Sequence, residues 1–195
     1  MELVAAGDGA GGGVRPLDFE ELAPELQMLL APRVARLGYL GGFFRCAGHQ
    51  PEALAHFIRY TEALKDALPN ELVETVALTA ATILGNDYER NQHERLCISL
   101  GFGEHWVSCV ERAASGGDTS ALKSDVAACS AYVKAALSAG DPERALGALV
   151  AAVGEADAVG IALTAARYVA HALVVRSFGI EPPVSSIFDR GASNG

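Results

Sequence analysis

The spacing of apolar residues is the feature that most restricts what this 195-residue chain can fold into. In the segment PEALAHFIRYTEALKDAL, Leu54, Ile58 and Leu64 recur at intervals that place them on one face of a helix. Pro51 begins the segment and suits the first turn of that helix, where its missing N–H is not needed. No segment shows the sustained alternation of apolar and polar residues that hairpin strands require. The sequence therefore predicts an all-α fold.

Further helices are expected wherever the same period returns between residues that begin or end helices. These helices are one or two short ones within 17–36, and then 71–84, 86–100, 101–115, 121–139, 142–153 and 155–178. Asn70 can cap the helix that follows it, and Gly85 and Gly101 can end helices. The segment LGYLGG, residues 37–42, is expected to form a glycine-broken turn.

Four segments are predicted along the chain. They are a disordered N-terminal tail at 1–16, a helical core at 17–114, C-terminal helices packing on that core at 121–181, and a flexible tail at 182–195. The polar run SGGDTS, residues 115–120, is the clearest linker in the chain. We interpret it as the separation between two helical lobes, and the sequence leaves open whether residues 121–179 are a second lobe or complete the first.

Charge and composition argue against several classes of partner. The net charge of -9 disfavours nucleic acid and anionic membranes, because those partners need clustered Lys and Arg. Glu155, Asp157 and Arg167 interrupt the most apolar region, so no membrane-spanning run is expected. The four cysteines form no CxxC pair, and the N-terminus lacks the pattern of a secretory signal. We therefore expect a cytoplasmic protein without a zinc ribbon or a dithiol motif.

The stretch NDYERNQHERLC, residues 86–97, gathers polar side chains within about three helical turns. One face of this helix carries residues spaced three and four apart, which are Asn86, Glu89, His93 and Cys97. In the preceding helix, Glu74 lies on a face that is otherwise apolar, where a carboxylate must be paired, hydrogen-bonded or protonated. If the two helices pack together, Glu74, Glu89 and His93 form one proton-relay site.

Simpler interpretations of the same residues remain open. Glu89 and His93, four residues apart, can form an ordinary ion pair on a helix surface. Tyr88 can be a core aromatic residue with a satisfied hydroxyl, and Cys97 a small buried core residue. A metal site is not expected, because the spacing is Glu-x-x-x-His, whereas two-helix di-iron proteins use Glu-x-x-His, and no second such motif occurs.

Two consecutive segments resemble the carboxymuconolactone decarboxylase-like superfamily, which includes the alkylhydroperoxidase D-like (AhpD-like) proteins. They are LGYLGGFFRCAGHQPEALAHFIRYTEALKDAL and ELVETVALTAATILGNDYERNQHERLCISLGF, and the likeness runs from Leu37 to Arg112. It rests on the YExxxH element, the glutamate upstream of it and the glycine that ends its helix. The later segment YVAHALVVRSFGIEPP is similar to the C-terminal helix of many AhpD-like members. The resemblance implies an AhpD-like helical bundle and a homo-oligomer, either a trimer or a hexamer.

The resemblance also implies which residues to compare with the peroxidase branch of the family. That branch uses an upstream glutamate, a CxxC pair and a histidine four residues beyond the second cysteine. The glutamate falls on Glu74 and the histidine on His93, whereas Asn86 and Glu89 occupy the two cysteine positions. Without a dithiol, the cycle through sulfenic acid and disulfide has no chemistry to use. We therefore do not expect a CxxC thiol peroxidase.

The decarboxylase branch of the family does not depend on cysteines. Our leading hypothesis is a cofactor-independent acid/base enzyme that acts on a small organic acid or lactone, by decarboxylation or a related proton transfer. Glu74 is the expected buried acid or base, His93 the second proton carrier and Glu89 the group that orients it. Asn86 and Tyr88 are expected to hydrogen-bond to the substrate. No metal and no other cofactor is expected.

Two alternatives come from other functional classes. The first is a non-catalytic small-molecule-binding or structural oligomer, in which the polar stripe is a satisfied buried network that fixes helix register. The second, ranked last, is a divergent peroxidase that works through Cys46 or Cys97. The sequence does not identify the substrate or the direction of proton transfer.

Overall fold

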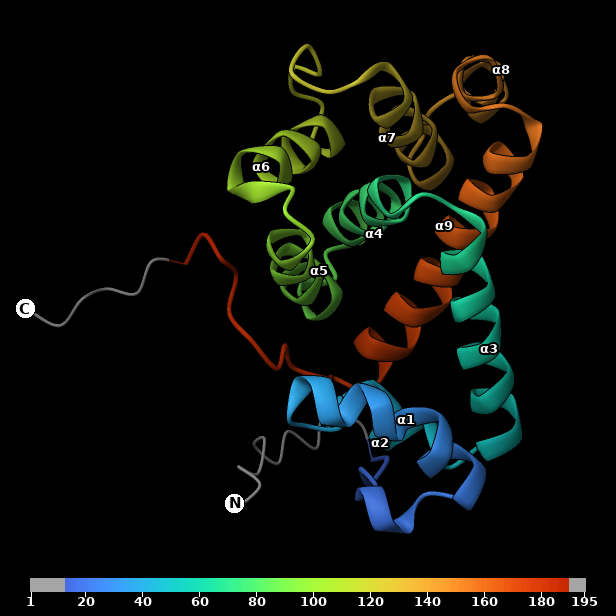
Figure 1. Ribbon diagram of the computed structural model, residues 1–195, viewed down its shortest axis with the longest axis vertical. Coiled ribbons are helices and arrows are strands. Elements are labelled where there is room, and N and C mark those ends of the chain that lie inside the picture. Colours follow the sequence, from blue (N-terminus) through green and yellow to red (C-terminus); the bar gives the residue numbers. More distant parts are fainter. Residues whose placement is uncertain (1–12, 190–195) are drawn as a thin grey trace, which may run out of the picture.

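The computed structural model describes residues 13–189 of the chain. Within that range the regular structure is helical throughout, so the predicted all-α fold is confirmed (Figure 1). The elements are, in order, η1 (Phe19–Glu21), α1 (Pro24–Leu37), α2 (Gly42–Ala47), α3 (Pro51–Ala67), α4 (Asn70–Leu84), α5 (Asp87–Ser99), α6 (Gly103–Ala114), α7 (Ser124–Leu137), α8 (Pro142–Val153) and α9 (Glu155–Ser177). The outer parts of the two predicted tails, 1–12 and 190–195, lie outside the described residues.

Helix α4 lies at the centre of the bundle. It packs against α5, α6, α7 and α9 (Figure 1), and every residue from 72 to 81 is buried. The main hydrophobic core joins α4 residues such as Val76 to Val133 of α7, Leu149 of α8 and Ile161 of α9. Because the segments before and after the SGGDTS run share this core, the interpretation of that run as a separation between two lobes is wrong. It is a surface connection within one bundle.

Helix α9 is the long helix that closes the bundle and carries part of the site described below. Among the described residues it is the one helix long and apolar enough, by length and composition, to cross a membrane. The expectation that its charges prevent such a run is therefore wrong, since Glu155 and Asp157 lie in its first turn. Half of the apolar stretch is buried inside the fold, where α9 packs against α3, α4, α7 and α8.

The N-terminal helices form a second hydrophobic cluster, which α5 and α9 complete through Tyr88 and Val175. Helix α2 follows the predicted glycine turn and is not anticipated by the periodicity, because its six residues make fewer than two turns. A Cβ at Gly41 would come within 2.5 Å of the Tyr88 hydroxyl. The backbone N–H of Phe43 donates to the same hydroxyl at 3.4 Å. Glycine at position 41 therefore lets α2 sit directly against α5.

Part of the predicted flexible tail at 182–195 is held against α5. The hydroxyl of Ser186 and the backbone N–H of Ile187 both donate to Oε2 of Glu94, at 2.8 and 2.7 Å. Glu94 is completely buried, so its carboxylate needs these donors. For these residues the prediction of a flexible tail is wrong, because a buried acceptor on α5 binds the segment.

Candidate functional site

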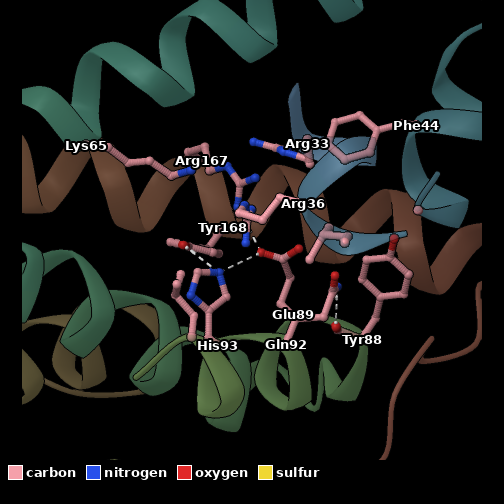
Figure 2. Close-up of a pocket in the computed structure, with 13 residues that line it drawn as sticks. Arg33, Arg36, Phe44, Lys65, Tyr88, Glu89, Gln92, His93, Arg167 and Tyr168 are labelled. Carbon is pink, nitrogen blue, oxygen red and sulfur yellow. Dashed lines mark hydrogen bonds and ion pairs between the residues drawn. The ribbon is translucent and has the colours of Figure 1, made fainter. Parts of the chain in front are cut away.

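A small pocket lies where α5 faces α1, α3 and α9 (Figure 2). One wall is formed by side chains of α5, namely Tyr88, Glu89, Gln92 and His93. Figure 2 shows basic side chains on the side opposite α5, namely Arg33 and Arg36 of α1, Lys65 of α3 and Arg167 of α9. The pocket has a volume of about 100 Å³. Since drug-sized ligands occupy roughly 300 Å³ or more, it suits a molecule of few heavy atoms.

Local structure explains why the polar stripe of α5 faces the pocket. Gly85 ends α4 in the left-handed conformation at φ +60°, which lets the chain turn immediately into α5. The side chain of Asn86 then caps α5 by accepting a hydrogen bond from the backbone N–H of Glu89 at 3.4 Å. The four-residue spacing places Glu89 and His93 on the same side of the helix. Packing of α5 against α4 brings Glu74 to this side as well.

His93 lies between two carboxylates. Its Nδ1 is 2.6 Å from Oε2 of Glu74, and its Nε2 is 3.3 Å from Oε2 of Glu89 and 3.1 Å from the Tyr168 hydroxyl. Burial alone would lower the pKa of His93, but the charges and hydrogen bonds of Glu74 and Glu89 raise it to about 9. At neutral pH the ring is therefore an imidazolium. Its Nδ1–H donates to Glu74, and its Nε2–H faces Glu89 and the Tyr168 hydroxyl. Figure 2 shows the contacts of Nε2.

Glu89 is a carboxylate with basic side chains near both oxygens. Oε2 accepts from Nη1 of Arg167 at 3.1 Å, and Oε1 lies 3.1 Å from Nε2 of His171. Burial alone would raise the pKa of Glu89, but His171, Arg167 and His93 together hold it well below its ordinary value. Burial lowers the pKa of His171 to about 4, so this ring is uncharged at neutral pH. Glu89 therefore stays ionised and is a poor proton acceptor.

The basic side of the pocket contrasts with the net charge of -9 of the chain. Arg33 and Lys65 share one carboxylate oxygen, Oε1 of Glu62, at 3.0 and 3.3 Å. Burial lowers the pKa of both side chains, because both are partly withdrawn from water. Arg36 and Arg167 also line the pocket, so the cations outnumber the carboxylates around it. An anion is the ligand that this wall attracts.

The chain was compared with protein families, curated proteins and solved structures. No family model and no curated protein matches it. Among solved structures, it is similar to the debrominase Bmp8, with a TM-score of 0.76 and 18% sequence identity over 90% of this chain and 95% of that one. The Bmp8 structure is of a variant with a cysteine replaced by alanine, in complex with 2,3,4-tribromopyrrole. Bmp8 has the AhpD-like helical architecture.

This chain has the AhpD-like fold. The family resemblance seen in the sequence predicted this architecture, and the prediction is confirmed. At 18% identity the likeness to Bmp8 concerns the fold and not the reaction.

The three residues predicted to form a proton relay are brought together in this fold. Glu74, Glu89 and His93 lie within one hydrogen-bonded chain, and their side chains are 4%, 9% and 11% exposed. The alternative of an ordinary ion pair on the helix surface is therefore wrong, because α4 and α9 cover this face of α5. The catalytic role of the three residues stays a prediction.

The two predicted substrate-binding residues differ in position. Tyr88 lines the pocket but is 3% exposed, and its hydroxyl is already in contact with the backbone N–H of Phe43. Asn86 does not line this pocket, because its side chain caps α5 through the N–H of Glu89. The structure therefore accounts for Asn86 as a helix cap, and a contact with substrate in this pocket is not supported.

Sequence reasoning missed the residues that other helices contribute. The sequence pattern predicts Arg167 only as an interruption of an apolar region, and it predicts no site role for His171 or Tyr168. All three lie on buried positions of α9, and Arg167 and His171 are four residues apart. Two ionisable residues at helical spacing within a buried apolar face are the signal that would have found them, because buried charge needs a partner. The basic residues of α1 and α3 carry no comparable signal.

The cysteines around the site lack the features of a reactive thiolate. All four cysteines are buried and free. Sγ of Cys97 lies 3.7 Å from Oε2 of Glu74, and burial together with that carboxylate raises the thiol pKa. Burial likewise raises the pKa of Cys46. Neither has the lowered pKa of a reactive thiolate. Within residues 13–189, no three His, Cys, Asp or Glu side chains are arranged to hold a metal ion.

Proposed function

We propose that this protein is a cofactor-independent acid/base enzyme that acts on a small organic acid or lactone, by decarboxylation or a related proton transfer. The observation that carries the proposal is the buried His93 imidazolium, which lies between Glu74 and Glu89 at the wall of a pocket rich in cations. A proton donor beside an anion-binding wall is the combination that such a reaction needs.

Each side of the pocket has its own task in the proposed reaction. Arg33, Arg36 and Lys65 bind the carboxylate of the substrate, with the partly buried cations acting more strongly than they would in water. His93 donates from Nε2–H, and Glu74 exchanges a proton with Nδ1 of the same ring. Glu89, which is fixed by Arg167, orients the ring and keeps it charged before reaction.

In a decarboxylation the C–C bond to the carboxylate breaks and carbon dioxide leaves. The electron pair moves into a neighbouring carbonyl of the substrate, and His93 delivers its proton to the resulting enolate. Loss of that proton leaves a neutral ring between two carboxylates, which then recovers a proton from solvent. In an isomerisation no carbon dioxide leaves: His93 delivers its proton to one position of the substrate, and the neutral ring then takes a proton back from another position. Positioned proton transfer of this kind contributes about 10²–10⁴-fold to rate.

The structural neighbour supports an enzyme but does not choose the reaction. Bmp8 is a debrominase with the same architecture, so the fold is compatible with catalysis on a small molecule. The reaction type proposed for this chain rests on its own side chains, with the His93 imidazolium beside the basic wall favouring acid/base chemistry. The lack of a CxxC pair in the sequence argues only against a thiol peroxidase cycle.

A non-catalytic binding or structural protein is the second candidate. The observation in its favour is that Glu89 already has three basic side chains within 3.3 Å, those of Arg167, His171 and His93, as a purely structural buried network would. Under this alternative, changes at His93 lower stability and leave small molecules unaltered.

The test uses an untargeted mass-spectrometric comparison. A small-molecule extract of the source cells is incubated with wild-type protein, with His93→Gln and Glu74→Gln, and with the control His56→Gln, which changes an exposed residue of α3. We expect wild type and control to deplete one metabolite and to form a product lighter by carbon dioxide or isomeric with it. If wild type turns nothing over, or if all four proteins act equally, the proposed function is wrong.

We also propose that the protein forms a homo-oligomer, as the family resemblance implies. The exposed face of α9 supports this, because Val159, Leu163 and Leu173 are 59%, 45% and 50% exposed and recur at helical spacing. Size-exclusion chromatography with light scattering tests the proposal, and a monomer at micromolar concentration contradicts it.

A further inference from the structure

The hydroxyl of Tyr168 contacts His93 at the wall of the pocket, and the proposed acid/base reaction leaves it unused. Tyr168 belongs to α9, lines the pocket and is 3% exposed. Its hydroxyl oxygen is 3.1 Å from Nε2 of His93, which is the nitrogen that carries the proton to be donated (Figure 2). A substrate that receives this proton therefore binds close to Tyr168 as well.

Both ring nitrogens of His93 face acceptors that belong to the protein. Nδ1 is 2.6 Å from Oε2 of Glu74, and Nε2 is 3.3 Å from Oε2 of Glu89. Because carboxylate oxygens only accept hydrogen bonds, each nitrogen carries a proton and neither keeps a lone pair. The Tyr168 hydroxyl therefore cannot donate to Nε2. Its oxygen accepts from Nε2–H, and its own O–H is left free to donate elsewhere.

The free O–H of Tyr168 has no acceptor within the described part of the chain. Among residues 13–189, the hydroxyl has no hydrogen-bond partner besides His93. The ring itself is held in place, because the Arg167 guanidinium lies 4.5 Å from its centroid and the His93 ring meets it edge-on with centroids 5.5 Å apart. Buried donors are normally paired, so an unused O–H at the wall of a pocket indicates that a ligand supplies the acceptor.

The surroundings of Tyr168 keep its hydroxyl protonated. Burial raises the pKa of Tyr168 well above its ordinary value; Arg167 acts against this shift, whereas Glu89 and Glu74 add to it. The tyrosine therefore cannot serve as a base at neutral pH, and it can only donate. An enolate carbon is more basic than a phenolate, so a phenol can protonate it, provided that a neighbouring donor replaces the lost proton in the same step. His93 is that neighbour.

We propose that Tyr168 is the catalytic residue that passes the proton of His93 to the substrate, a step that rests on the proposed function. The O–H bond of Tyr168 breaks, and a C–H bond forms at the enolate carbon with the electron pair of the enolate. At the same time the Nε2–H bond of His93 breaks, and a new O–H bond forms on Tyr168. The tyrosine is thus unchanged at the end of the step, and the neutral His93 ring recovers a proton from solvent.

Protonation of a nitronate at carbon tests this relay without the natural substrate. The probe is the nitronate of 3-nitropropionate, a small carboxylate whose anionic carbon resembles that of an enolate and takes up a proton slowly in water. Stopped-flow absorbance follows loss of the nitronate in mildly alkaline buffer, where His93, with a pKa of about 9, is still charged. We expect the full wild-type chain to accelerate the protonation, with a rate that saturates as the nitronate concentration rises.

Three variants separate the relay from a direct transfer by His93. Tyr168→Phe should lower the rate at saturating nitronate by about 10²–10⁴-fold, because it removes the group that reaches the carbon. The half-saturating concentration should change much less, since the basic side chains that hold the carboxylate remain. His93→Gln should show a similar loss of rate. The control Tyr60→Phe also removes a hydroxyl with one hydrogen bond, to the backbone oxygen of Leu163, and should act as wild type does.

The relay is wrong, and His93 donates directly, if Tyr168→Phe is as fast as wild type while His93→Gln is slow. A slow Tyr168→Phe with a fast His93→Gln also contradicts the relay, because the tyrosine would then act without the histidine. If wild type does not accelerate the protonation, the proposed proton donor and the relay are both wrong. Should Tyr168→Phe fail to fold, Tyr168→Met takes its place, because its flexible side chain fills the same space without a hydroxyl.

Discussion

Protonation of His93 should make the stability of the fold decrease as pH rises above neutrality. The pKa of His93 is raised from 6.5 to about 9 in the folded protein by Glu74 and Glu89, which act against the effect of burial. A histidine whose folded pKa is raised contributes stability that is fully present below its unfolded pKa and is lost as pH rises through the folded one. The window in which the loss occurs therefore runs from 6.5 to about 9.

The size of the loss follows from the same two values. A difference of one pKa unit corresponds to about 1.4 kcal/mol, so the change from 6.5 to about 9 corresponds to about 3 kcal/mol. For a chain of this length, that loss lowers the melting temperature by about 6–12 °C. It is also a large part of a typical unfolding free energy of about 5–15 kcal/mol.

Urea unfolding at a series of pH values measures this loss directly. Buried cysteines such as Cys97 and Cys129 also destabilise the fold at high pH, because their raised pKa values favour the unfolded thiolate. The difference between wild type and His93→Gln removes their contribution, since both proteins contain them. We expect that difference to shrink by about 3 kcal/mol across the window, while His56→Gln parallels wild type. A constant difference would refute the assignment of His93 as a buried imidazolium.

Three further predictions concern the partners of two of the buried glutamates, Glu89 and Glu94. Arg167→Met removes one of the two cations beside Glu89, the other being His93, and should reduce the unfolding free energy by about 3–5 kcal/mol. Adding Glu89→Gln should restore part of the loss in a double-mutant cycle, and strictly additive effects would contradict the pairing. His171 is neutral in the fold, with a pKa lowered to about 4, so stability should fall as pH drops from 6.5 towards that value, and His171→Gln should flatten this acid limb in urea titrations. Ser186→Ala removes one donor to Glu94 and should lower the unfolding free energy by about 1–3 kcal/mol. The C-terminal segment should then be cleaved faster by proteases, and an unchanged cleavage rate would show that other contacts hold it.

The helices could be predicted from the sequence because their signals are local. Pro51 begins α3 and Gly85 ends α4, and both positions agree with the structure within a residue. Glu74, Glu89 and His93 could also be found, because a polar stripe on an apolar background is visible at helical spacing. The prediction needed only one assumption about packing, namely that α4 and α5 are neighbours.

The rest of the site depends on contacts between residues far apart in the sequence. Arg167 and Glu89 are separated by 78 positions, and no local pattern states that α9 returns to cover α5. The tail at Ser186 shows the same limit, because its order depends on a buried carboxylate 92 positions away. Helix α2 was missed for a different reason, since six residues are too few to show a period. Composition and spacing therefore predict which segments are helical, and only the packing of the folded chain determines which helices are in contact.

Position 89 holds a glutamate in this chain, whereas the resemblance implies that the peroxidase branch of the family has its second cysteine there. Residues of α9 explain how the fold accommodates this buried carboxylate. A thiol at position 89 is small and neutral when buried, whereas Glu89 is charged and 7% exposed, so it needs compensation. Arg167 and His171 supply it from the last helix, and His93 gains a second carboxylate that keeps its ring charged. Under the proposed function, the position that in that branch holds a histidine partnering a nucleophile holds a proton donor, His93, in this chain. In other chains of this fold, we expect glutamate at this position to occur together with a basic residue on the face of the last helix that covers it.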